Sequence, residues 1–199
     1  MDNTALGSLT MSFAKAGLSA GTTTTISTTT TVPYCIEGVW QTSKTAITNG
    51  ATPTTDWSTG NAFVPIPIPL TSTGLPFGVP GACAGYACAY AVGLDNTGAI
   101  RVIQGPIVGL DANGNFISAA PSLNPSFGPN GPNPGTIAGG VGADNNFCII
   151  GAITVKLGSA AVATWTFGTN NLSGVTGVTY NFTDLATVPN GSLYSLTYS

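Results

Sequence analysis

Apolar and polar residues along this chain repeat with a period of two, which is typical of β-strands. The clearest case is residues 82–94, ACAGYACAYAVGL, where bulky side chains alternate with alanine and glycine from Tyr86 onward. Successive side chains of a strand point to opposite faces, so this segment predicts a central strand covered on both sides. Residues 147–157, FCIIGAITVKL, predict a second strand of the same kind.

Shorter segments predict further strands. These are residues 34–40, residues 161–167 pairing back on 147–157 through Gly158–Ala160, residues 177–185 with Val178, Tyr180 and Phe182 inward, and residues 192–199. No segment has the pattern of an amphipathic helix. The predicted fold class is therefore all-β, a β-sandwich or a jelly-roll-like barrel.

Two similar segments, GLDNTGAI at 93–100 and GLDANGNF at 109–116, place Asp and Gly between apolar runs, as hairpin turns do. Asp111, Asn113 and Asn115 also resemble the start of a calcium loop. However, Gly114 comes too early for an EF-hand and no glutamate closes the site. We therefore expect turns at both places and no metal site.

The first segment, residues 1–33, ends in a threonine-rich stretch, TTTTISTTTT at 22–31. Threonine is stiff and favours strands, so we expect an extended N-terminal arm. It is either a frayed terminus or an arm that becomes ordered on a neighbouring subunit. For the second alternative the candidate assembly residues are Thr22, Thr23, Thr24, Thr25 and Ile26. Residues 34–199 are expected to form one β-domain with a long Pro/Gly-rich loop at 118–146.

The stretch VPIPIPL at 64–70 has proline at every second position, namely Pro65, Pro67 and Pro69. Alternate N–H groups of a strand point to the same edge, so these prolines would leave one edge without donors while the other can still pair. In this interpretation the prolines limit assembly, because few charges are present to protect a strand edge. The alternative is a polyproline-like linker between two halves of the chain.

Charge is scarce: the chain has four basic and seven acidic residues, no histidine, and a net charge of −3. Nucleic-acid binding needs clustered Lys or Arg, which the sequence lacks. The first residues show no basic region leading into an apolar one, and the longest apolar run is too short to span a bilayer. We expect a protein made in the cytoplasm that does not enter membranes and packs against copies of itself or partners.

The sequence offers little catalytic chemistry. Without histidine, no Ser-His or Cys-His nucleophile can form, and the acidic residues lie mostly in turn contexts. The spacing of Cys35, Cys83, Cys88 and Cys148 is unusual for zinc, so we expect buried free thiols. We predict that the protein is not an enzyme and needs no cofactor.

Three segments, at 62–79, 101–116 and 166–190, resemble small virion proteins of tailed bacteriophages encoded near the major capsid protein. The resemblance covers roughly residues 34–190. It lies in short stretches of similar sequence and does not include a catalytic motif. It implies a capsid decoration, or cement, protein on the exterior of the virion, whose partners are the major capsid protein and, as a trimer, itself. The alternatives are a phage fibre, spike or receptor-binding protein and a secreted adhesin-like subunit.

Overall fold

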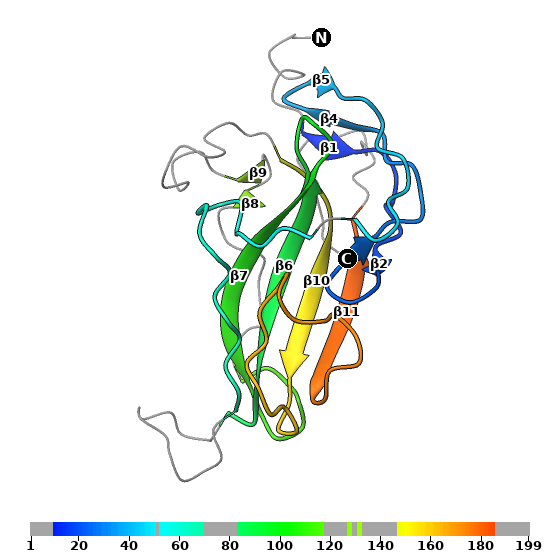
Figure 1. Ribbon diagram of the computed structural model, residues 1–199. Coiled ribbons are helices and arrows are strands. Elements are labelled where there is room, and N and C mark those ends of the chain that lie inside the picture. The colour runs from blue at the N-terminus through cyan, green and yellow to red at the C-terminus, as the bar shows by residue number, and fades with distance from the viewer. Residues whose placement is uncertain are drawn as a thin grey trace.

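The computed structural model of the chain describes residues 10–50, 52–69, 83–117 and 147–185, and the backbone of two short strands at 127–128 and 131–132 (Figure 1). These residues form antiparallel sheets and contain no helix, and none of the sheets closes into a barrel. The all-β prediction is therefore confirmed. The predicted strand at 192–199 and most of the predicted loop at 118–146 lie outside the described residues.

The largest element is a four-stranded antiparallel sheet in the order β11-β10-β6-β7. Its strands are β6 (Gly85–Leu94), β7 (Ile100–Leu110), β10 (Cys148–Leu157) and β11 (Val178–Asp184). The strands expected at 82–94 and 147–157 are the two central ones and pair directly, with Ile153 opposite Tyr90. Strand β6 is buried on both faces, as its apolar sequence predicts, whereas β10 alternates between buried and partly buried residues.

Strand β7 has one extra residue opposite β6, because Cys88 pairs with Ile107 while Tyr90 pairs with Gln104. This bulge contains Pro106, which cannot donate a backbone hydrogen bond and is tolerated at such irregular edge positions. The four-stranded sheet therefore ends at β7 with an edge that is irregular in its second half.

Three smaller sheets accompany the main one. The first joins β1 (Met11–Ser12), β4 (Tyr34–Ile36) and β5 (Val39–Trp40); the others are the pairs β2 (Ser19–Ala20) with β3 (Ile26–Ser27) and β8 (Phe127–Gly128) with β9 (Gly131–Pro132). The single strand expected at 34–40 is thus a hairpin. Its turn residues Glu37 and Gly38 have φ of 50° and 76°, the backbone that a two-residue type I′ turn requires.

The core lies between one face of the main sheet and the segments that cross it. Tyr90 of β6 packs against Phe63, Trp165 and Phe167, with ring centroids 6.0, 6.0 and 4.8 Å away. All four side chains are at most 3% exposed. Aromatic residues on irregular segments therefore form one part of the cover of the sheet.

Residues 10–33, from the expected extended N-terminal arm, form part of this cover. Ala16, Leu18, Ile26 and Val32 are buried in the same core cluster as the main sheet. Leu18 also donates its N–H to the Asp184 carboxylate of β11 at 2.9 Å. Apolar residues spaced among the threonines give the segment a buried side, and burial of such side chains outweighs the freedom of an extended chain.

The prediction of a strand at 161–167 is wrong. These residues form no strand, and β11 pairs with β10 in its place, from Leu157 opposite Val178 to Gly151 opposite Asp184. Trp165 makes an isolated bridge to Ile66, with N–H···O distances of 2.8 and 3.1 Å. Trp165 and Phe167 therefore cover the sheet without joining it.

Candidate functional site

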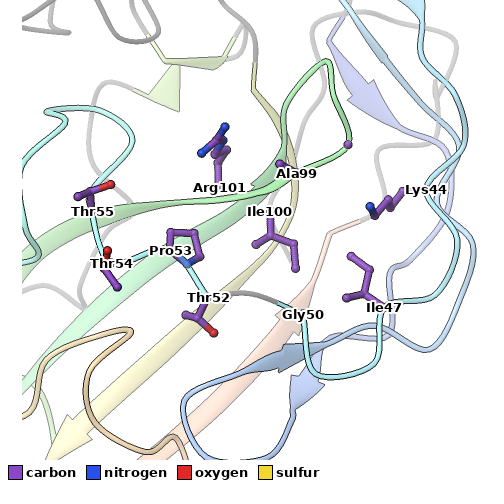
Figure 2. Close-up of a pocket in the computed structure, with 11 residues that line it drawn as sticks. Lys44, Ile47, Gly50, Thr52, Pro53, Thr54, Thr55, Ala99, Ile100 and Arg101 are labelled. Carbon is purple, nitrogen blue, oxygen red and sulfur yellow. The ribbon is translucent and has the colours of Figure 1, made fainter.

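A groove with a volume of about 510 Å³ opens beside the turn between β6 and β7 (Figure 2). Its walls come from three segments of the chain: Lys44 to Gly50, Thr52 to Thr55, and Gly98 to Arg101. Ile47, Pro53 and Ile100 supply apolar surface, and threonine side chains supply hydroxyl groups. Two of the four basic residues of the chain, Lys44 and Arg101, line it.

Asp95 fixes the position of Arg101. One Asp95 carboxylate oxygen accepts hydrogen bonds from the Thr97 N–H, the Thr97 hydroxyl and the Ala99 N–H at 2.6 to 3.0 Å. The other accepts the Arg101 Nε–H at 2.8 Å. Burial raises the pKa of this carboxyl, but the hydrogen bonds from Thr97 and Arg101 outweigh it and hold the pKa below its usual value.

Arg101 is also held from its other side. Its guanidinium carbon lies 4.3 Å from the centroid of the Trp57 ring, within the range of a cation–π contact. Lys44 differs, because its ammonium group has no ion-pair partner within the described part of the chain. The groove thus has one anchored and one unpaired cation.

A second surface feature is an apolar patch formed by Phe13, Val39 and Trp40. Val39 and Trp40 form β5, at the edge of the small sheet, and are 61% and 65% exposed. The Trp40 ring stacks on Phe13, with centroids 4.5 Å apart and an angle of 17° between the planes. This stacking holds a large apolar surface in one position while it faces solvent.

The predicted assembly residues Thr22 to Ile26 form the turn and second strand of the β2–β3 hairpin. The Thr22 N–H donates to Asn49 Oδ1 at 2.7 Å, and the Thr25 hydroxyl donates to the Thr22 carbonyl at 2.6 Å. Ile26 is fully buried, and its carbonyl accepts the Gly50 N–H at 2.9 Å. Ile26 is therefore a core residue in this chain.

The carbonyl groups of Thr23 and Thr24 accept hydrogen bonds from the Leu172 N–H and the Thr52 hydroxyl, at 3.0 and 2.6 Å. Thr22 and Thr23 are exposed at the turn. A role of this turn in assembly stays a prediction, and only the tip of the hairpin is open to a partner.

The proline segment lies on the body of the protein without forming a strand. Ile66 is fully buried and Val64 is 60% exposed, so the alternate apolar residues of this segment do not share one face as they would in a regular strand. Gln104 takes the place of a neighbouring strand: its Oε1 accepts the Val64 N–H at 2.7 Å, and its Nε2 donates to the Val64 carbonyl at 2.8 Å.

Ile66 donates its N–H to the Trp165 carbonyl and accepts the Trp165 N–H. Pro65 is exposed, whereas Pro67 and Pro69 are partly buried. The described residues do not test whether the prolines limit assembly.

The four cysteines are free thiols, with Cys83 partly exposed and the others buried. Burial raises the pKa of Cys88 to about 11 and that of Cys148 further, so both are protonated at neutral pH. Among the described residues, no three His, Cys, Asp or Glu side chains gather as a metal site would require.

The paired Asp-Gly segments are turns, as predicted. The Asp111 carboxylate accepts the N–H groups of Asn113 and Asn115 at 2.9 and 2.8 Å. Asp56 makes a related turn, accepting the N–H and hydroxyl of Ser58. The turn context expected for the acidic residues is therefore confirmed at Asp56 as well.

The groove itself was missed, because no local pattern in the sequence links Lys44 with Arg101.

No protein-family model matches the chain, and comparisons with curated proteins and with solved structures found no match. The described residues include no helix long and apolar enough to cross a membrane. The functional interpretation therefore rests on the residues and their geometry.

Proposed function

We propose that this protein is a structural virion protein that decorates a phage capsid and stabilises it by bridging capsid subunits. The observation that carries the proposal is the patch of Phe13, Val39 and Trp40, an immobilised apolar surface on an edge strand. Exposed apolar surface of this kind is typical of protein contact sites, and Trp is enriched among the residues that dominate binding energy.

The composition supports the same role. With only eleven charged residues among 199, the surface is covered by threonine, serine, asparagine and glycine, and repels copies and partners weakly. Contacts made by such a surface depend on shape and apolar area, which suits a protein bound at many sites on a particle. The major capsid protein is the proposed partner, and the trimer rests on the phage resemblance.

We infer in the same way that the complete chain forms a β-sandwich or jelly-roll-like domain. In support, the segment from Ala16 to Ile36, which carries β2 to β4, buries apolar side chains in the same core cluster as one face of the four-stranded sheet. A receptor-binding protein would be expected to gather aromatic residues on surface loops. Here Trp165 is in the core and Arg101 covers Trp57, so Trp40 is the tryptophan left for contact.

The experiment is quantification of the protein in purified virions. We expect a fixed ratio to the major capsid protein and loss of binding to stripped capsids when Trp40 is replaced by Ala. Removing a central tryptophan of an interface costs about 2 kcal/mol or more, which weakens binding more than tenfold.

Val162→Ala is the matched control, because Val162 is 83% exposed and lies on another loop. It should bind as the unmodified protein does. Absence from purified particles, or presence in the tail alone, would refute the decoration role. Equal binding of Trp40→Ala and Val162→Ala would refute the role of the patch.

A further inference from the structure

The outer edge of β7 has unused backbone groups beside the groove. The Asp95 N–H donates to the Ala99 carbonyl at 3.1 Å, so Ile100 and Val102 point their backbone groups away from β6. The Val102 carbonyl accepts the Trp57 N–H at 2.9 Å. The N–H and C=O of Ile100 have no hydrogen-bond partner among the described residues, and Ile100 lines the groove.

The charges around this free edge have one sign. Lys44 and Arg101 line the groove and none of its described lining residues is acidic. Asp95 is 2% exposed, and its carboxylate already accepts hydrogen bonds from the turn and from Arg101. It is therefore not available to interact with a ligand. Figure 2 shows the side chains of Ile100 and Arg101 on opposite sides of β7, as expected for consecutive residues of a strand. The groove therefore joins the unpaired backbone groups of Ile100 with one unpaired cation, Lys44, on a protein of negative net charge.

We propose that this groove binds an extended acidic peptide segment of a partner protein. The segment adds as a short strand to β7 at Ile100, which supplies one N–H and one C=O, and one of its carboxylates pairs with Lys44. Strand addition gives main-chain hydrogen bonds, while alternate side chains of the peptide meet the wall of the groove. Ile47, Pro53 and Ile100 suit its apolar side chains.

Other anionic ligands fit less well. A sugar ring is usually bound on an aromatic face, and Arg101 already covers the Trp57 ring. A small free anion would use neither the Ile100 backbone nor the apolar wall. The assignment of the peptide to a capsid subunit rests on the proposed function. The proposal that the peptide is acidic and extended rests only on the groove.

The test is fluorescence anisotropy of the full chain with a labelled, capped peptide that alternates glutamate and valine. Lys44→Gln should weaken binding about fivefold, the upper range for a solvent-accessible ion pair, and salt should weaken it further. Lys15→Gln makes the same change of charge outside the groove and should bind normally. Circular dichroism checks that both variants are folded.

Two peptide controls test the strand geometry. N-methylation of the residues whose N–H groups point to one edge should abolish binding, and methylation of the residues that point to the other edge should not. A peptide with lysine in place of glutamate should not bind. Equal loss in Lys15→Gln, equal binding of both methylated peptides, or equal competition by free glutarate or a sulfated glycan would each overturn the proposal.

The outcome is separable from that of the proposed function. Peptide binding by a protein that is missing from virions would leave the groove assignment standing and refute the decoration role. Virions that carry the protein, together with no binding of the acidic peptide, would refute the groove assignment alone.

Discussion

Replacing Asp95 by Asn tests whether one buried carboxylate organises the turn that presents Arg101. Asparagine keeps an oxygen for the N–H groups of Thr97 and Ala99 but places an NH₂ donor against the Arg101 Nε–H donor. The variant therefore loses one charge-assisted hydrogen bond, which contributes about 1.5 to 3 kcal/mol. The Arg101 side chain is 35% exposed and can be hydrated instead. We therefore expect the free energy of unfolding of Asp95→Asn to fall by about 2 kcal/mol.

The assay is urea unfolding followed by tryptophan fluorescence, with the free energy obtained by linear extrapolation. The same loss should lower Tm by about 4 to 8 °C for a chain of this size. Asp111→Asn is the matched control, because Asp111 holds the same kind of turn without a basic partner. It should change stability little.

The effect should also depend on pH. The pKa of Asp95 is lowered in the fold, so its contribution is present above its ordinary value of 3.8 and is lost as the pH falls through the folded-state pKa. The stability difference between the unmodified protein and Asp95→Asn should thus be constant near neutral pH and shrink below about pH 4. A loss as large in Asp111→Asn, or a difference that does not change in acid, would refute this reasoning.

Three further outcomes follow from burial. Ile26→Ala should lower the free energy of unfolding by about 2 to 5 kcal/mol in the same urea assay, whereas Thr23→Ala should change it little; equal effects would contradict the core position of Ile26. Gln104→Leu should cost about 1 to 2 kcal/mol because it leaves the Val64 backbone without partners, and an unchanged midpoint would contradict that role. Iodoacetamide at pH 8 should modify only Cys83 in the native protein, by mass spectrometry, and all four cysteines after denaturation. Because the pKa of Cys88 is raised from 9.0 to about 11, its contribution to stability is present below pH 9 and should fall as the pH rises towards 11.

Local patterns were sufficient for the strands and turns that depend on local geometry. The alternation of Tyr86 to Leu94 predicts β6 because side-chain direction in a strand depends only on position along the chain. The Asp-Gly turns follow for a similar reason, since the Asp side chain bonds to N–H groups two to four residues later.

Tertiary structure decided everything that depends on a distant partner. The residues of 161–167 favour a strand, yet β10 pairs with β11, because pairing depends on which backbone edge arrives in register. The threonine-rich stretch is compatible with solvent or with a packed surface, and burial of Ile26 decided between them. The groove exists because folding brings Lys44 beside the β6–β7 turn that holds Arg101, a proximity that no repeat or spacing in the sequence encodes.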